Sequence, residues 1–135
     1  MNSIENVDQK LIENLANLMS SEVRAKIYIY LRKYNKSTVD EIAGGTGIYP
    51  STVRESILDM YNTGYVSREK MDKEGLGKKP YLYTAAAPSY IVKKISKNIQ
   101  EKLNDLIMVD RRIESKELKI PFVPVKIVVD EKYRD

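Results

Sequence analysis

A run of side chains able to donate or accept hydrogen bonds follows a proline near the middle of the chain, and two adjacent lysines come later. These residues are Tyr49, Ser51, Thr52, Arg54, Glu55, Lys78 and Lys79. Hydroxyl, guanidinium, carboxylate and ammonium groups form hydrogen bonds and ion pairs. Grouped in this way, they favour recognition of a polar or anionic partner.

Catalytic chemistry is poorly supported. The chain has no Cys and no His, which excludes disulfides, thiol nucleophiles, Ser-His triads and the usual zinc ligand set. The glycine-containing stretches 44–47 and 75–78 lack the spacing of a phosphate-binding loop. We therefore expect no enzymatic activity, no metal site and no cofactor.

Size and composition predict a soluble globular chain. Its 135 residues suit about one domain, with 42% apolar and 31% charged residues and a formal net charge of +4. No apolar run approaches the roughly 20 residues that a membrane helix needs. The N-terminal ten residues include acids and do not resemble a secretory signal. These features predict a cytoplasmic protein without membrane association.

The elements that position the polar run begin with two helices. Apolar residues spaced by three or four predict an N-terminal helix over 1–19, with one face formed by Ile4, Val7, Leu11, Leu15 and Leu18. Ser20-Ser21 then offers a helix cap. The second helix has the same spacing at Val23, Ile27, Leu31 and Tyr34.

A helix-turn-helix is predicted next. Thr38 and Glu41 form a capping-box pattern, and Pro50 suits the first turn of a following helix over about 50–63. Ala43, Gly47 and Val53 have the required spacing: a small residue where the helices approach, a glycine in the turn and an apolar residue that packs between them.

Two strands complete a winged helix. Residues 65–70 and 81–84 are rich in β-branched and aromatic residues, and the polar, glycine-containing segment 71–80 lies between them. We therefore predict a mainly α fold with a small β hairpin, a winged helix-turn-helix over 20–87.

This region resembles the winged-helix domain of transcription regulators of the TrmB, MarR and ArsR types, with the TrmB-like branch most similar. The matching segments are 22–28, 38–43, 46–53, 64–66 and 77–83. Ser56 departs from the resemblance, because an aliphatic residue is common there. The resemblance implies a regulator that binds double-stranded DNA.

Groove geometry then suggests roles for the polar run. A helix fits the major groove, where its first turns meet base edges. Arg54 is the best candidate for a bidentate guanine contact, with Ser51 and Thr52 bonding phosphate or bases. Glu55 accepts from cytosine or orients Arg54, and Tyr49 faces the DNA backbone. Lys78 and Lys79 reach phosphates or the minor groove from the wing.

The C-terminal third carries a different pattern. Apolar residues at heptad spacing predict a long helix over 88–118 that buries a stripe against a partner helix, which favours a homodimer. The stripe comprises Val92, Ile95, Ile99, Leu103, Leu106 and Ile113. Packing within the chain, against Ile4, Leu11 and Leu18, is the alternative. Residues 119–135 are predicted to form an extended tail.

A second function stays open. Residues 51–84 carry nearly balanced basic and acidic side chains, which is a weak electrostatic field for DNA. A winged helix that binds proteins of the transcription or replication machinery would also fit the low basicity and the apolar tail. Salt dependence separates the two functions, because DNA binding weakens steeply as salt rises.

Overall fold

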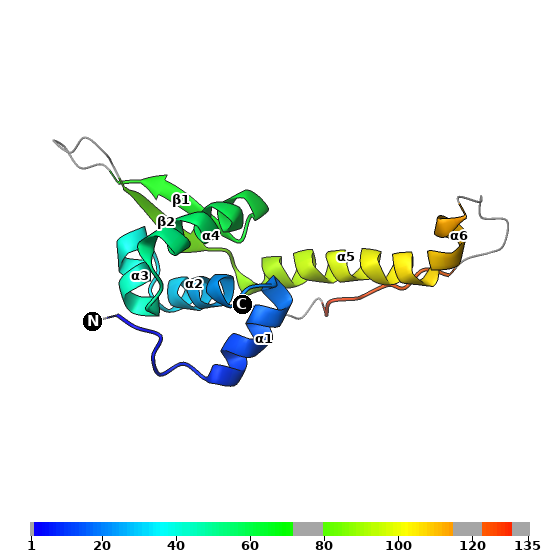
Figure 1. Cartoon of the computed structure of the whole chain (residues 1–135), viewed down its shortest axis with the longest axis horizontal. Coiled ribbons are helices and arrows are strands. Elements are labelled where there is room, and N and C mark those ends of the chain that lie inside the picture. Colours follow the sequence, from blue (N-terminus) through cyan, green and yellow to red (C-terminus); the bar gives the residue numbers. More distant parts are fainter. Residues whose placement is uncertain (1, 72–79, 115–122, 131–135) are drawn as a thin grey trace. The chain divides into compact units, whose positions relative to one another are not determined.

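The computed structural model describes residues 2–71, 80–114 and 123–130. These form two compact units, Met1–Ala86 and Ala87–Asp135 (Figure 1). None of the helices in the described ranges is long and apolar enough to span a membrane.

Helix α2 (Glu22–Lys33) is the centre of the first unit and contacts α1 (Gln9–Met19), α3 (Val39–Thr46), α4 (Pro50–Thr63) and β2 (Tyr81–Ala85). Ser21 caps α2, its hydroxyl accepting a hydrogen bond from the Arg24 N–H at 3.1 Å. Because it is surrounded, α2 buries residues on most of its circumference: Ala25, Ile27, Tyr28, Ile29, Tyr30 and Leu31.

Helices α3 and α4 form the predicted helix-turn-helix. The Thr38 and Glu41 side chains cap α3 reciprocally, so the predicted capping box is present. Gly47 ends α3 at φ 73°, a left-handed conformation that glycine adopts without strain. Ala43 and Val53 are both buried. The spacing read from the sequence is confirmed.

The hairpin pairs β1 (Val66–Lys70) with β2 in antiparallel register, and Arg68 lies opposite Tyr83. Ser37 forms an antiparallel β-bridge with Tyr83 on the other edge of β2. The Ser37 N–H donates to the Tyr83 carbonyl at 3.1 Å, and the Tyr83 N–H donates to the Ser37 carbonyl at 2.8 Å. Gly64, at φ 84°, separates α4 from β1. The mainly α, winged-helix fold with one hairpin is confirmed.

The N-terminal segment differs from its prediction. Helix α1 begins only at Gln9, because the Asp8 carboxylate caps it by accepting the Lys10 N–H at 3.0 Å. The predicted inward face was wrong in part: Leu11 and Leu18 are exposed, whereas the buried side chains of α1 are Ile12 and Met19.

Ahead of α1, the chain is anchored to the motif. The Ile4 N–H donates to the Gly45 carbonyl at 3.1 Å, and the Ile4 side chain is buried. The Tyr34 hydroxyl donates to the Ser3 carbonyl at 3.1 Å and accepts the Ser3 N–H at 3.3 Å. This backbone hydrogen bond from Ser3 lowers the pKa of Tyr34. Ile4 is thus a core residue held outside any helix.

Two neighbouring glycines of α3 give a matched test of this anchoring. A Cβ at Gly45 would overlap the Tyr30 ring and lie 2.8 Å from the Asn2 carbonyl oxygen, whereas one at Gly44 would meet nothing within 4 Å. We expect Gly45→Ala to lower the free energy of unfolding by about 1–2 kcal/mol. Gly44→Ala should raise it by up to about 1 kcal/mol through helix propensity. Urea unfolding of both variants checks the difference, and equal shifts would contradict this packing.

The second unit contains α5 (Pro88–Ile107) and α6 (Val109–Ile113) in its described part. The sequence predicts one helix to about 118, but the helix is interrupted at Met108, whose φ is −94° and ψ 8°. Val109 is β-branched, which weakens helix propagation at this point. The Arg112–Asp105 ion pair spans the interruption. Residues 115–118 lie outside the described range.

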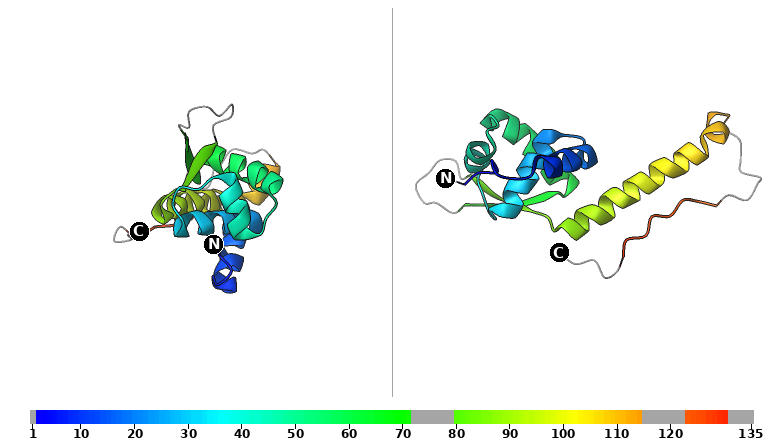
Figure 2. Two further views of the ribbon diagram at one scale, coloured as in Figure 1. Left: turned by 90° about the vertical axis from the view of Figure 1, so that its left-hand side faces the viewer. Right: turned by 90° about the horizontal axis from the view of Figure 1, so that it is seen from below.

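Residues 123–130 form neither helix nor strand and run beside α5 in the opposite direction (Figures 1 and 2). The Asn104 side chain accepts the Val125 N–H at 2.6 Å and donates to its carbonyl at 3.1 Å. About one turn earlier on α5, the side-chain Oε1 of Gln100 accepts the Ile127 N–H at 2.9 Å. Two amide side chains on α5 therefore hold the backbone of the tail.

Candidate nucleic-acid interface

Helix α4 separates its side chains into two faces. Val53, Ile57 and Met60 are buried, while the predicted contact residues at its start are all exposed: Tyr49, Ser51, Thr52, Arg54 and Glu55. Tyr49, in the turn before the helix, is 81% exposed. The structure thus brings five of the seven predicted contact residues together at one end of α4. The other two, Lys78 and Lys79, lie outside the described residues.

The start of α4 carries backbone donors as well as side chains. Pro50 occupies the first turn, and no side chain caps this end of the helix. The first N–H groups of a helix have no partner within it, and the helix dipole gives this end a partial positive charge. The start of α4 therefore suits an anionic group such as a phosphate.

Arg54 also meets an acidic neighbour on the preceding helix. Its Nη2 lies 3.9 Å from Oδ1 of Asp40 on α3, and both side chains are mostly exposed. Such a solvated ion pair contributes about 0–1 kcal/mol. It orients the guanidinium only weakly, so a phosphate or a guanine edge could replace Asp40 as its partner.

A groove of about 570 Å³ adjoins this end of α4, between the start of α3 and the hairpin. Polar, charged and aromatic side chains share its lining, which consists of Thr38, Val39, Asp40, Arg54, Pro80, Tyr81 and Tyr83. Arg54 of α4 and the hairpin residues Pro80 and Tyr81 therefore line the same groove.

Several basic residues of the first unit are paired with acids. Lys36 Nζ lies 3.1 Å from Glu69 Oε1, and Arg24 Nη2 lies 3.4 Å from Asp59 Oδ2. These pairs reduce the positive potential of the surface around the motif, in line with the nearly balanced charge of its sequence. Affinity for a polyanion would then depend on a few well-placed contacts rather than on a strong field.

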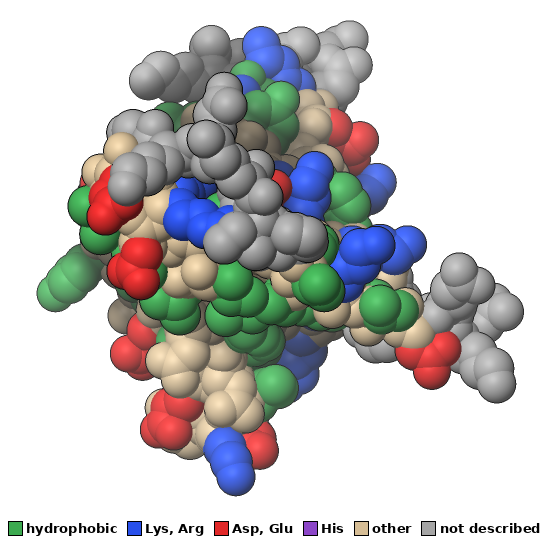
Figure 3. Space-filling view, turned by 90° about the vertical axis from the view of Figure 1, so that its right-hand side faces the viewer, with side chains coloured by type: hydrophobic (Ala, Val, Ile, Leu, Met, Phe, Trp, Pro, Cys, Tyr) green, Lys and Arg blue, Asp and Glu red, His purple; other side chains and the backbone are tan. Residues whose placement is uncertain are grey.

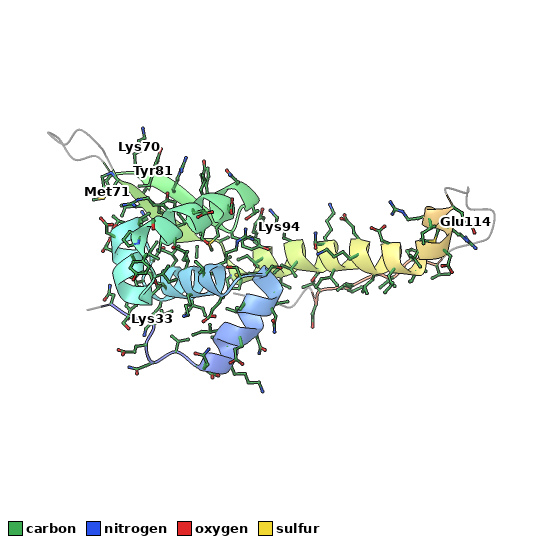
Figure 4. The ribbon with its side chains drawn as sticks, viewed as in Figure 1. Lys33, Lys70, Met71, Tyr81, Lys94 and Glu114 are labelled. Carbon is green, nitrogen blue, oxygen red and sulfur yellow. The ribbon has the colours of Figure 1, made fainter. Side chains whose placement is uncertain are left out.

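Sequence reasoning missed a cluster where α4 meets the hairpin. The Arg68 guanidinium lies 4.1 Å from the ring centroids of both Tyr61 and Tyr81. Lys70 and Tyr81 lie near each other at the described end of the hairpin (Figure 4), with Lys70 Nζ 5.9 Å from the Tyr81 ring centroid. The alternation along β1 indicates that Val66, Arg68 and Lys70 share a face, but it gives no sign that this face meets Tyr61 of α4.

The predicted dimer residues are increasingly exposed along the second unit. Val92 and Ile95 are partly buried, Ile99 and Leu103 are each 38% exposed, Leu106 is 67% exposed and Ile113 is 75% exposed. Ile107 and Val109 add to this apolar surface. Hydrophobic side chains are also visible between charged ones in the space-filling view from the α6 end (Figure 3).

Comparison with known sequences identifies one family. The profile of the family described as "Sugar-specific transcriptional regulator TrmB" matches residues 17–89. This range includes α2, the helix-turn-helix, the hairpin and the start of α5. A search of curated proteins gave no match.

Solved structures share the fold at low sequence identity. A possible transcriptional regulator from Methanosarcina mazei Go1 has a TM-score of 0.63 and 15% identity, with 78% of this chain and 88% of that chain covered. TrmBL2, described as an archaeal chromatin protein with a novel mode of DNA binding, has a TM-score of 0.62 and 13% identity. This match covers 78% of the present chain, which spans only 40% of the TrmBL2 chain.

Proposed function

The chain belongs to the TrmB family of transcriptional regulators, and on that basis we propose that it binds specific sequences of double-stranded DNA as a homodimer. In this proposal α4 enters the major groove, and the wing contacts the DNA backbone or the minor groove. DNA binding follows from the family. Sequence specificity, the groove contacts and the dimer are our proposals.

The observation that carries the proposal is the exposed polar end of α4. Arg54 is directed to a guanine edge, while Ser51, Thr52 and the first backbone amides bind phosphate or neighbouring bases. Glu55 accepts from cytosine or orients Arg54, and Tyr49 packs against the DNA backbone. Val53 and Ile57 support this arrangement, because their burial holds α4 rigidly on the scaffold.

The apolar stripe of α5 and α6 supports the dimer. A pair of subunits related by a two-fold axis presents two recognition helices to a site with matching symmetry. Leu106 and Ile113 project mostly into solvent in the single chain, and pairing of two such helices would bury them.

Selection of bound fragments from a random pool of double-stranded DNA tests the function. We expect enrichment of a palindromic site whose half-sites are about one helical turn apart. Affinity for the selected site should fall steeply with salt. If the protein retains no DNA at low salt, it does not bind DNA. If it retains DNA but no common sequence is enriched, only the proposed sequence specificity is contradicted.

Removing both wing lysines tests the second contact. Lys78→Ala with Lys79→Ala should weaken binding to all DNA sequences to a similar extent. The salt slope should fall by about one to two units per half-site, because phosphate contacts release counterions. Binding titrations at several salt concentrations check this result. If affinity and slope are both unchanged, the wing lysines do not contact DNA.

A protein-binding module is the second candidate function. Leu58 and Tyr61 are exposed apolar side chains on α4, where a wholly polar face would be expected of a helix that meets only DNA. Proteins of the transcription machinery are the partners that this function would imply. Complexes formed mainly by apolar contact should resist salt, which distinguishes them from DNA complexes.

A further inference from the structure

Along the face of the hairpin that meets the helices, the side chains of β1 change from buried and apolar to exposed and charged. Val66, Arg68 and Lys70 share one face of β1, and Ala85, Tyr83 and Tyr81 lie opposite them on β2. Val66 and its partner Ala85 are buried, Arg68 is partly buried and Lys70 is exposed. Arg68 therefore lies where the apolar contact with the helices ends and the projecting part of the hairpin begins.

Arg68 contacts two aromatic rings at this point. Its guanidinium carbon is 4.1 Å from the ring centroid of Tyr61 on α4 and 4.1 Å from that of Tyr81 on β2. A side-chain hydrogen bond to Tyr83 raises the pKa of Arg68. We call Tyr61, Arg68 and Tyr81 the Arg68 sandwich. The guanidinium carbon lies over both rings, and the attraction of the cation to each ring restricts the movement of the Arg68 side chain.

The sandwich connects the hairpin to the helix that carries the proposed base contacts. Tyr61 follows Arg54 by seven residues, about two helical turns, so both side chains lie on the same side of α4. A change in the Arg68 contacts would therefore allow the hairpin to change its angle to this side of α4.

We propose that Arg68 is a positioning residue: through its contacts with Tyr61 and Tyr81 it sets the angle between the paired strands β1 and β2 and the recognition helix α4. This inference rests on the proposed DNA binding. Two rigidly connected elements can contact DNA together without first being ordered, which reduces the entropy lost on binding.

Arg68 as a direct phosphate contact is the competing role, and lysine distinguishes the two. Lysine keeps the positive charge but has no planar group to stack between two rings. In the positioning role, Arg68→Lys and Arg68→Met should both lower DNA affinity about three- to tenfold with an unchanged salt slope. In the contact role, Arg68→Lys would keep most of the affinity, and Arg68→Met would lower the slope by about one unit per half-site.

Tyr61 supplies the matched variants. Tyr61→Phe keeps the ring and should bind DNA like the native chain, whereas Tyr61→Leu should reproduce the loss seen for Arg68→Met. Because both substitutions break the same sandwich, the double variant should be no weaker than either single one. Additive losses, or a loss with Tyr61→Phe, would overturn the proposal.

A measurement without DNA tests the angle itself. In the native chain, residual dipolar couplings of backbone amides in β1 and β2 should fit the same alignment tensor as those in α2, α3 and α4. In Arg68→Met and Arg68→Lys the hairpin couplings should shrink, whereas Lys70→Met, which removes a neighbouring charge, should leave them unchanged. Unchanged couplings in both Arg68 variants would overturn the proposal. A native chain that fails to bind DNA would instead refute the proposed function, and the couplings would still decide the role of Arg68.

Discussion

The double variant Ile99→Asp with Leu106→Asp is expected to be monomeric, with its first unit still folded. It should bind the DNA site at least about 100-fold more weakly than the native dimer. Burying an aliphatic side chain contributes about 1.5–3 kcal/mol, so several such residues together can hold two subunits. Placing two carboxylates in the apolar stripe of α5 opposes dimer formation, because each charged group would be removed from water without gaining a hydrogen-bond or ion-pair partner.

The weaker DNA binding follows from the loss of the second half-site. In a dimer the second recognition helix binds at high effective concentration once the first is bound, and a monomer loses this advantage. Sedimentation equilibrium gives the mass of each variant, and titration of the selected DNA gives the affinity.

Lys93→Asp with Lys97→Asp is the matched control, because these exposed residues lie on a different side of α5 from Ile99. This control should remain dimeric despite its two added carboxylates. A native chain that is monomeric at micromolar concentration would refute the dimer and would favour coverage of the stripe within one chain.

Arg54→Ala should lower affinity for the selected site by about 1–3 kcal/mol and relax the base preference at one position per half-site. The reason is the position of Arg54 in the exposed first turns of α4, where its only acidic partner in the described residues is the weakly held Asp40. Affinity for unrelated DNA should fall much less. Repeating the selection with the variant shows which position loses its preference.

Asp40→Asn provides the control for this prediction. It removes the competing carboxylate with little change of shape, so affinity for DNA should rise slightly while the base preference stays the same. Thermal unfolding of both variants should resemble that of the native chain, since the Arg54–Asp40 ion pair is exposed. Unchanged affinity and unchanged preference in Arg54→Ala would refute the proposed guanine contact.

The helix-turn-helix was predictable because its signals are local. The Thr38 and Glu41 side chains each accept a backbone N–H within the same turn, and Gly47 suits a left-handed turn, so neither signal depends on distant residues. The exposed residues at the start of α4 then followed from helical periodicity, since Val53 and Ile57 must face the core.

Features that depend on tertiary packing were missed. The three- and four-residue spacing placed Leu11 and Leu18 inward, but the Asp8 cap starts α1 late and Ile12 and Met19 are buried instead. The Arg68 sandwich joins residues of α4, β1 and β2, so periodicity within a single element cannot predict it. The ends of the stacked side chains meet only after the hairpin has packed against the helix.

The way α5 holds the tail has a consequence for how its sequence can vary. Asn104 and Gln100 bond to backbone atoms of Val125 and Ile127, and not to their side chains. Four helical residues advance about 6 Å and two extended residues about 6.6 Å. The spacing of the two hydrogen-bonding side chains on α5 therefore matches the spacing of the two backbone N–H groups for almost any amino acids in the tail. Proline is the exception at either position, because it has no N–H to donate. The outward side chains of this segment can therefore diverge freely among related proteins while the segment stays attached to α5.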